Sequence, residues 1–350
     1  MTVRPDRIDT VALVESPAQF LHVLEWCHCE RAAGRTRVIV LAPSDESTGV
    51  QLTSMADFAA EEGIGVQWHH RNAPLAARYR TITDLRSAVE DAQRLVIGDP
   101  FSGMIWMLLP FARAREVVVV DDGTATLEFA AQLSAGASLR RWHSRPGLTR
   151  APLAWHARRF FERTRVTLFT VMTVTGLPGS RLQSHGYDWT RRRFGPPRAL
   201  RGLDVIGSSL VETGVVEPEA YLDAVAALAQ EPGAGGRYFA HRREDPDKLR
   251  RVGQRSGLRV VRPTVPLEIE LRRGPVPSRL ASFPSSVGYT LPLVLAGTGT
   301  RILVQPLPEA MIREHVGVRA REFLDRVGAD MRTAAAGLST GGSAAVSLSG

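Results

Sequence analysis

Three short groups of reactive side chains each follow a segment that has the composition of a buried strand. They are Asp121-Asp122-Gly123 after residues 117–120, His241 after residues 237–240, and Ser285-Ser286 after residues 279–283. A carboxylate serves as a general base, and an imidazole donates a proton to a leaving phosphate near neutral pH. Hydroxyls and free N–H groups at the start of a helix bind phosphate. Together the groups supply three catalytic residue types at three expected strand ends.

Each group also has an ordinary structural interpretation. Asp-Gly is a common strand-to-helix turn, serine is a common helix N-cap, and a histidine at a strand end can be solvated or hydrogen-bonded within the fold. Successive strand positions face opposite ways, so we expect one of Asp121 and Asp122 to point into a cleft as a base while the other secures the turn. The residue types and their spacing leave both interpretations open.

The chain alternates β-branched runs with amphipathic segments. We expect strands at residues 10–14, 37–41, 65–68, 95–97 and 116–120, with helices at 17–31, 50–62, 82–93 and 101–113. Beyond about residue 202 the alternation resumes, with strands near 204–206, 237–240, 258–261, 279–283 and 301–304. Strands that alternate with helices indicate βαβ units and a parallel, doubly wound sheet, which binds ligands beyond the carboxyl ends of its strands.

The sequence therefore predicts an α/β protein with two Rossmann-like domains that face a central cleft. The expected N-terminal domain covers residues 1–202 and includes an arginine-rich insert at about 139–202, where the alternation breaks. The expected C-terminal domain covers residues 203–308. A helix at 309–333 and a disordered tail at 334–350, rich in Ala, Gly, Ser and Thr, complete the expected organisation.

The composition is that of an ordinary globular chain. Of its 350 residues 44% are hydrophobic and 23% are charged, which argues against global disorder or a fibre. No apolar run reaches the ~18–20 residues of a membrane-spanning helix, and no signal peptide is visible, so we expect a cytoplasmic protein. Two cysteines cannot form a disulfide framework. Cys27-His28-Cys29 lies in an expected helix, where positions i and i+2 face different sides, so we expect no metal there.

The positive charge is concentrated in one region. The net charge is +8, and the basic residues are 43 arginines and a single lysine, Lys248. Residues 140–201 hold 14 arginines against Glu162 and Asp188, a net charge of +12, which leaves −4 for the rest. This region suits an anionic glycan acceptor or peripheral contact with an anionic membrane, and it is equally compatible with a solvated basic face. We expect no nucleic-acid partner, because no base-reading motif accompanies the charge.

The three groups, in this order, resemble the short motifs of the bacterial sialyltransferases and polysialyltransferases. Those motifs are an acidic pair followed by Gly, a His-Pro, and a Ser-Ser or Ser-Thr. Segments 15–21, 98–99, 206–212 and 266–268 are also similar, so the resemblance spans residues ~10–305. Arg242 stands where the family has proline, which leaves the histidine motif half matched.

The resemblance implies the GT-B fold and an inverting transfer of sialic acid from CMP-sialic acid to a glycan hydroxyl in surface polysaccharide or glycolipid synthesis. It implies that Asp121 is the general base, with Asp122 as the fallback. His241 would bind the CMP phosphate and protonate it as it leaves. The implied donor-binding residues are Ser285, Ser286, Glu268, Gly123 and Gly207.

We expect no cofactor and no metal, because hydroxyls and a helix dipole can stabilise the leaving phosphate and no Asp-x-Asp triplet follows an expected strand. Two alternatives stay open. The donor is another CMP-linked nonulosonic acid or a different nucleotide sugar, or the chain is a non-catalytic homologue that binds nucleotide or glycan. An RNA-binding α/β protein is a third, minor hypothesis. We also expect His69-His70, after a strand, to be a loop pair or part of a cleft wall and not a pair of metal ligands.

Overall fold

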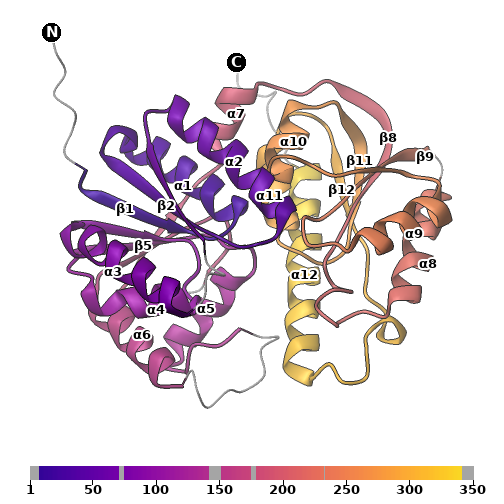
Figure 1. Cartoon of the computed structure of the whole chain (residues 1–350). Coiled ribbons are helices and arrows are strands. Elements are labelled where there is room, and N and C mark those ends of the chain that lie inside the picture. The colour runs from indigo at the N-terminus through magenta and orange to yellow at the C-terminus, as the bar shows by residue number, and fades with distance from the viewer. Residues whose placement is uncertain (1–7, 71–74, 142–150, 175–178, 232, 341–350) are drawn as a thin grey trace, which may run out of the picture. The chain divides into compact units, whose positions relative to one another are not determined.

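The chain divides into two compact units. The computed structural model describes residues 8–70, 75–141, 151–174, 179–231 and 233–340, and Figure 1 draws the others as a thin grey trace. Unit 1 consists of Met1–Trp189 with Thr264–Pro266, and unit 2 of Thr190–Pro263 with Leu267–Gly350. The division lies at Trp189, earlier than the expected residue 202, and the first strand of the second sheet begins at Ala199.

Unit 1 is built on a seven-stranded parallel sheet with the strand order β3-β2-β1-β4-β5-β6-β7. Its strands are β1 (Thr10–Val14), β2 (Thr36–Ala42), β3 (Gly65–His70), β4 (Arg94–Ile97), β5 (Glu116–Val120), β6 (Val166–Thr170) and β7 (Arg181–Ser184). Its helices are α1 (Pro17–Glu30), α2 (Glu46–Glu61), α3 (Leu75–Asp91), α4 (Gly103–Leu108), α5 (Ala125–Ser134) and α6 (Ala151–Arg163). The chain adds β2 and β3 on one side of β1 and then returns to add β4 on the other. This is the doubly wound arrangement that the sequence predicted.

Local sequence accounts for the elements that carry unit 1. Four successive valines make β5 almost entirely apolar, and all four are buried, as expected for a parallel strand covered on both faces. Helix α1 begins with Pro17, and the Ser16 hydroxyl before it accepts the N–H of Gln19 at 3.3 Å. Proline fits the first helical turn because its missing N–H would have no helical partner there. The helix ends at Glu30, and its C-cap residue Arg31 adopts a left-handed conformation.

The arginine-rich region as far as Trp189 belongs to unit 1 and supplies two strands of its sheet, which corrects the expectation of an insert. It contributes α6, β6 and β7, so the alternation of helix and strand continues through it. Strand β7 (Arg181–Ser184) is a short edge strand, largely exposed and polar, and therefore lacks the apolar signature of a buried strand. His69-His70 likewise belongs to β3, the opposite edge strand, and does not form a loop pair.

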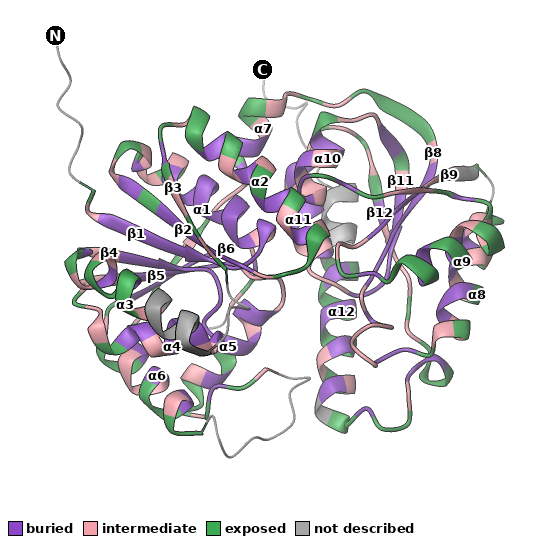
Figure 2. Ribbon diagram, viewed as in Figure 1, coloured by how far each residue is buried: buried purple, intermediate pink, exposed green. Residues whose placement is uncertain are grey.

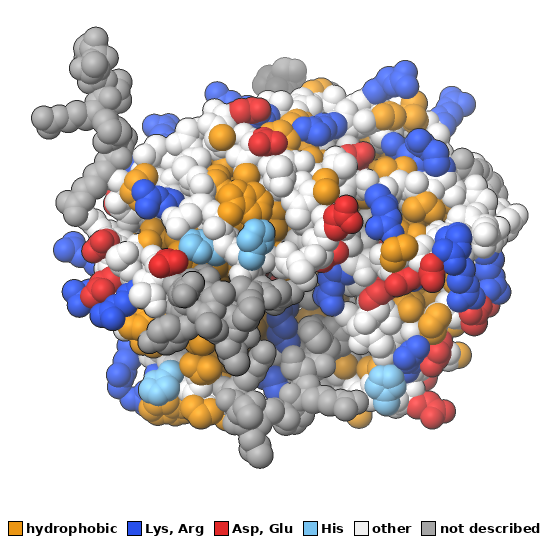
Figure 3. Space-filling view, in the orientation of Figure 1, with side chains coloured by type: hydrophobic (Ala, Val, Ile, Leu, Met, Phe, Trp, Pro, Cys, Tyr) orange, Lys and Arg blue, Asp and Glu red, His pale blue; other side chains and the backbone are white. Residues whose placement is uncertain are grey.

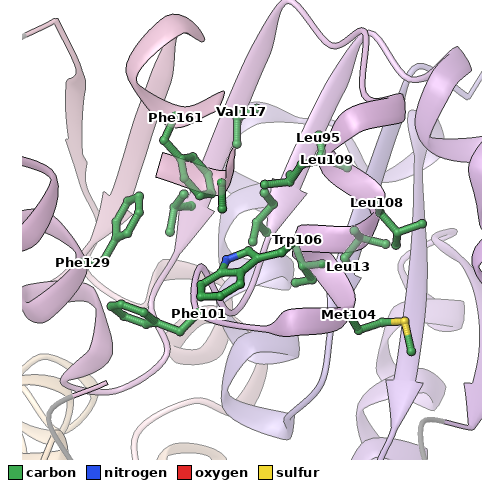
Figure 4. Packing of buried hydrophobic residues seen from close by; sticks show 14 of the residues in the cluster. Leu13, Leu95, Phe101, Met104, Trp106, Leu108, Leu109, Val117, Phe129 and Phe161 are labelled. Carbon is green, nitrogen blue, oxygen red and sulfur yellow. The ribbon is translucent and has the colours of Figure 1, made fainter. Parts of the chain in front are cut away.

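The core of unit 1 lies between this sheet and its helices. Figure 2 shows buried residues along the strands and exposed residues on the outer faces of the helices. Phe101, Phe129 and Phe161 pack edge to face, with ring centroids 6.2 and 5.0 Å apart. Trp106 lies beside Phe101 in the same cluster (Figure 4), and its indole N–H donates to the Pro100 carbonyl at 2.8 Å. The cluster fixes the segment between β4 and α4, which carries Asp99.

Unit 2 repeats the arrangement with a five-stranded parallel sheet in the order β10-β9-β8-β11-β12. Its strands are β8 (Ala199–Ile206), β9 (Ala234–Phe239), β10 (Arg259–Val261), β11 (Val276–Ser282) and β12 (Arg301–Val304). Its helices are α8 (Pro218–Ala229), α9 (Pro246–Ser256), α10 (Leu267–Arg273), α11 (Val287–Val294) and α12 (Val318–Thr340), while α7 (Asp188–Phe194) spans the boundary between the units. The strand order again reverses beside the first strand, between β8 and β11.

The C-terminal helix differs from its expected limits. A 3-10 turn at Glu309–Met311 precedes it, α12 begins only at Val318, and it continues to Thr340, into the segment expected to be disordered. Residues 341–350 lie outside the described part of the chain. The apolar residues Leu324, Val327 and Met331 of α12 are buried. No helix among the described residues is both long and apolar enough to cross a membrane.

Candidate active site

Asp121 is fully buried at the carboxyl end of β5. Its Oδ2 accepts the N–H of Val171 at 2.9 Å, whereas its Oδ1 has no hydrogen-bond partner among the described residues. Burial raises the pKa of Asp121 to about 6, and hydrogen bonds from Thr170, Val171 and Thr126 oppose part of that rise. A carboxylate with this pKa is half protonated near pH 6 and largely ionised at neutral pH, as a general base requires.

Asp122 lies in a different environment from its neighbour. Its Oδ2 is 2.7 Å from Nη2 of Arg141, and the same guanidinium nitrogen is 2.8 Å from Asp99 Oδ2. The Arg141 guanidinium also lies over the Phe101 ring at 5.6 Å. Gly123 adopts a left-handed φ of 57° in the turn to α5, a conformation that favours glycine. The structure therefore separates the two carboxylates: one is buried without a cationic partner among the described residues, and the other is paired with arginine.

Two histidines that the sequence analysis did not select lie beside Asp121. His22 comes from α1 and His185 follows β7, and their Nδ1 and Nε2 atoms are 3.3 Å apart. The Tyr187 N–H donates to His185 Nδ1 at 3.4 Å, so the proton of neutral His185 is on Nε2 and points toward His22. His22 Nδ1 then accepts, and its Nε2–H donates to the Tyr187 hydroxyl at 3.2 Å. Burial lowers the pKa of His22 to about 3 and that of His185 to about 2, so both rings are neutral.

His22, Asp121 and His185 form the only group of three potential metal ligands among the described residues. One ligand atom from each lies within 4.8 Å of the others. However, the hydrogen bonds just described occupy both nitrogens of each ring, and a metal would have to displace the bond between the two histidines. His22 and His185 are therefore better described as a hydrogen-bonded pair that lies beside Asp121. No local motif signals it, because 163 residues separate His22 from His185.

The ends of β1 and β4 meet at the switch point of unit 1. The Glu15 carboxylate accepts the Ser102 hydroxyl at 2.6 Å, and the Glu15 N–H donates to Gln19 Oε1 at 2.6 Å. The Gln19 side chain crosses directly over Gly98, where an added Cβ would overlap it. Only glycine admits this contact, so Gly98 allows the two strand ends to approach each other closely.

In unit 2, Gly207 and His241 follow the neighbouring strands β8 and β9. The Gly207 N–H donates to the Phe239 carbonyl at 2.8 Å, and the His241 N–H donates to Glu244 Oε2 at 2.6 Å. His241 Nδ1 accepts the Arg243 N–H at 3.2 Å, so its proton is on the outer atom, Nε2. Burial, together with the charges of Arg242, Arg243 and Lys248, lowers the pKa of His241 to about 3. The ring is therefore neutral at pH 7 and presents an N–H donor.

Ser285 and Ser286 lie between β11 and α11, across the switch point from Gly207. Ser286 is the N-cap residue of α11, but its hydroxyl makes no cap hydrogen bond. The Ser285 N–H donates to the sulfur of Met331 in α12 at 3.2 Å. A Cβ at Gly288 would overlap the same methionine side chain. Met331 therefore covers one of the N–H groups that a phosphate at this helix start would use.

Glu268 connects α10 to α11. Its Oε1 accepts the Thr290 hydroxyl at 2.8 Å, and burial raises the pKa of Glu268. The register pairs Ile206 with both Ser282 and Phe239, so β9, β8 and β11 end at the same edge of the sheet. The structure thus brings Gly207, His241 and the Ser285-Ser286 pair to adjacent strand ends. The acidic pair with Gly123 lies at the corresponding edge of unit 1.

Helix α6 carries part of the arginine-rich region. Ala154, Ala157 and Phe161 are buried, whereas Trp155 is 52% exposed. The Arg159 guanidinium lies 5.2 Å from the centre of the Trp155 ring. The view in Figure 3 shows basic and acidic side chains interspersed over the surface. Residues 142–150, which precede α6, lie outside the described part of the chain.

Comparison with known proteins finds similarity in structure only. No protein-family model matches the chain, and no curated protein matches it. The chain is similar to an alpha/beta-galactoside alpha-2,3-sialyltransferase from the luminous marine bacterium Photobacterium phosphoreum, with a TM-score of 0.53 and 12% identity over 93% of this chain and 96% of that one. A UGT2 from Phytolacca americana gives a TM-score of 0.49 with 13% identity, over 98% of this chain and 96% of that one. The similarity to the sialyltransferase shows that the chain has the GT-B fold predicted from its sequence.

Proposed function

We propose that the chain is a glycosyltransferase that moves sialic acid from CMP-sialic acid to a glycan hydroxyl with inversion, in the synthesis of a surface polysaccharide or glycolipid. The observation that carries the proposal is the division of Asp121 and Asp122 into a buried carboxylate of raised pKa and an arginine-paired one. The histidine and serines at the strand ends of unit 2 support it. The fold similarity to a sialyltransferase, at 12% identity, agrees with this function.

In the proposed reaction the acceptor oxygen attacks the anomeric carbon as the bond from that carbon to the CMP phosphate oxygen breaks. Asp121 Oδ1, which lacks a hydrogen bond among the described residues, takes the acceptor proton. This role requires the acceptor to reach a side chain that is buried in the present conformation. Asp122 is the fallback base, and its pairing with Arg141 makes it the weaker candidate.

On the donor side, His241 donates its Nε2–H to the phosphate. An anionic phosphate favours the protonated imidazole, so donor binding raises the pKa of His241 from its low value and enables proton transfer to the leaving group. Ser285 and Ser286 hold the phosphate at the start of α11, Gly207 and Gly123 allow close backbone approach, and Glu268 hydrogen-bonds the nucleotide. These groups stabilise the leaving phosphate without a metal.

The positive charge of the arginine-rich region favours an anionic binding partner. The exposed side of α6 combines Trp155 with Arg159, which suits an anionic glycan acceptor or the inner face of an anionic membrane. Binding to vesicles with and without anionic lipid, repeated at rising NaCl concentration, separates the two. Salt-sensitive binding to anionic vesicles supports membrane contact, and acceptor-dependent turnover without vesicle binding supports the acceptor role.

A non-catalytic nucleotide-binding homologue is the second candidate. It is favoured by Arg242 in place of the family's proline and by Met331 against the Ser285 N–H. The same fold also accommodates another CMP-linked nonulosonic acid or a different nucleotide sugar. These alternatives differ in the donor that is turned over, so a donor panel distinguishes them.

The test is release of CMP from CMP-sialic acid by the purified full chain in the presence of EDTA, with and without pooled glycan acceptors. Acceptor-stimulated release is the expected result. Saturable CMP binding without release favours another activated sugar or the binding-only homologue. Absence of both release and binding overturns the proposed function.

A further inference from the structure

The single lysine of the chain is buried where its ammonium group has three acceptors. Lys248 Nζ lies 2.8 Å from the Ser208 carbonyl, 2.8 Å from Glu244 Oε1 and 3.2 Å from Glu212 Oε2. The Tyr221 ring covers the group, with its centre 4.1 Å from Nζ. An ammonium carries three N–H donors, so each finds an acceptor here.

The acceptors come from the two loops that hold proposed donor residues. Ser208 and Glu212 belong to the loop after β8, which begins with Gly207. Glu244 belongs to the loop after β9, which begins at Ala240 and contains His241. Lys248 itself is in the first turn of α9 and donates to both loops. The Lys248 ammonium therefore connects the loop after β8 to the loop after β9, beyond the point where the two strands pair.

Glu244 completes the connection. Its Oε1 accepts the Tyr238 hydroxyl at 2.6 Å, and its Oε2 accepts the His241 N–H at 2.6 Å. Tyr238 in turn is 2.8 Å from the Tyr221 hydroxyl, which accepts the Ser208 N–H at 3.0 Å. Because the Ser208 N–H and the Tyr238 hydroxyl both donate, the Tyr221 hydroxyl donates to Tyr238. Every proton in this chain of bonds has one acceptor.

Gly207 lies against the same carboxylate. A Cβ at this position would overlap Glu244 Oε2 and would lie 2.8 Å from the Tyr238 hydroxyl. Oε2 is also the atom that accepts the His241 N–H. The same carboxylate oxygen thus accepts the His241 N–H and leaves no space for a side chain at position 207.

The chemistry of the cluster explains a lysine in a chain that otherwise uses arginine. All 43 other basic residues are arginines. A guanidinium is planar and spreads five donors over a fork, so it cannot direct three N–H groups from one nitrogen to three acceptors under an aromatic ring. The four-carbon stem and tetrahedral ammonium of lysine match this geometry.

We propose that Lys248 and Glu244 are positioning residues of the nucleotide site, which hold the Gly207 loop and His241 in register for the donor phosphate. The inference rests on the proposed function, because it assigns these loops to donor binding. Neither side chain is proposed to touch the donor. Both act through the backbone of Gly207, Ser208 and His241.

The first experiment measures CMP affinity and the donor and acceptor KM values of three variants. Lys248→Arg keeps the charge but changes the geometry, Lys248→Met removes the charge, and Glu244→Gln loses one acceptor while keeping the size. Arg250→Met is the matched control, because Arg250 is on the same helix and its ion pair with Asp247 is 60% exposed on the arginine side. Thermal unfolding of each variant verifies that it is folded.

We expect the CMP Kd and the donor KM to rise about tenfold or more in all three variants, because part of the binding free energy must then order the two loops. The acceptor KM and the Arg250→Met control are expected to stay unchanged. Folded variants that bind CMP as tightly as the wild type overturn the inference. A wild type that binds no CMP or other nucleotide overturns the proposed function as well, so the two failures are distinguishable.

A second measurement does not depend on a variant that folds. Because the chain has one lysine, labelling with side-chain ¹⁵N-lysine gives one ammonium signal. We expect this signal to be protected from exchange at neutral pH and to shift when CMP is added. A freely exchanging signal, or one that ignores bound CMP, contradicts the positioning role.

Discussion

Nη2 of Arg141 lies 2.7 Å from Asp122 Oδ2, yet Asp121, the adjacent residue, has no cationic partner among the described side chains. Arg141 also binds Asp99 at 2.8 Å, so one guanidinium bridges two carboxylates at the ends of β4 and β5. Asp121 instead accepts a backbone N–H and is completely buried. The difference between the two environments determines which carboxylate can act as a base near neutral pH.

Replacing the two acids separately tests this assignment. Asp121→Asn is expected to lower kcat about 10²- to 10⁴-fold, the range typical of a general base. CMP affinity should stay unchanged, because the side chains proposed to bind the phosphate, those of His241, Ser285 and Ser286, belong to unit 2. Asp122→Asn, the matched control, is expected to lower turnover much less. If turnover survives in Asp121→Asn and disappears in Asp122→Asn, the base is Asp122.

The pH dependence of turnover should report the raised pKa of Asp121. The base acts only when ionised, so kcat/KM for the acceptor is expected to rise about tenfold per pH unit below pH 6 and to level off above it. Rates measured between pH 5 and 8 with saturating donor test this. A profile that is flat across pH 6 contradicts the assignment.

The same carboxyl group should affect stability with a defined sign. Its pKa is about 6 in the folded chain against 3.8 for the ordinary group, so the native state binds the proton more tightly. Stability contributed by the protonated carboxyl is present below pH 4 and is lost as pH rises through 6. Asp121→Asn stays neutral. Its free energy of unfolding should therefore increase relative to that of the wild type as pH rises from 4 to 7, by up to about 3 kcal/mol. Urea unfolding of both proteins at several pH values measures the difference, and a difference independent of pH refutes it.

Metal removal should leave the activity unchanged. We expect equal turnover after dialysis against EDTA and after addition of Zn²⁺ or Mn²⁺, because the nitrogens of His22 and His185 bond to each other and to Tyr187. Metal analysis of the purified chain accompanies the assay. Stoichiometric metal that disappears in His22→Ala would show instead that His22, Asp121 and His185 bind an ion.

Gly207→Ala is expected to destabilise unit 2. The new methyl group would overlap Glu244 Oε2, and such overpacking costs about 1–3 kcal/mol. Gly49→Ala is the control, because Gly49 is in α2 with no atom within 4 Å of an added Cβ, and alanine favours a helix. Thermal unfolding should show a lower midpoint for Gly207→Ala and an equal or higher one for Gly49→Ala. Equal stability at position 207 would mean that the Glu244 loop can move without cost.

The sequence by itself determined the parts of the fold that depend on local pattern. Its alternation of apolar strands and amphipathic helices predicted β1, β5 and β12 with the limits the structure has. It also placed the three reactive groups at strand ends, because a run of buried β-branched residues stops where polar side chains begin. It missed β6 and β7 and therefore misjudged the arginine-rich region. The exposed polar residues of β7 carry no such pattern, whereas β6 is entirely buried and was overlooked among the surrounding arginines.

Only the tertiary structure decided what the groups at those strand ends can do. Asp121 and Asp122 are identical in type and adjacent in sequence, and they differ because Arg141 reaches one while Val171 and two distant histidines surround the other. The composition shows that Lys248 is the single lysine, but only the fold shows the three acceptors that surround its ammonium group. Burial and charge pairing depend on side chains that the fold brings together from remote segments, and those two effects set the pKa values and hydrogen bonds on which the proposed chemistry depends.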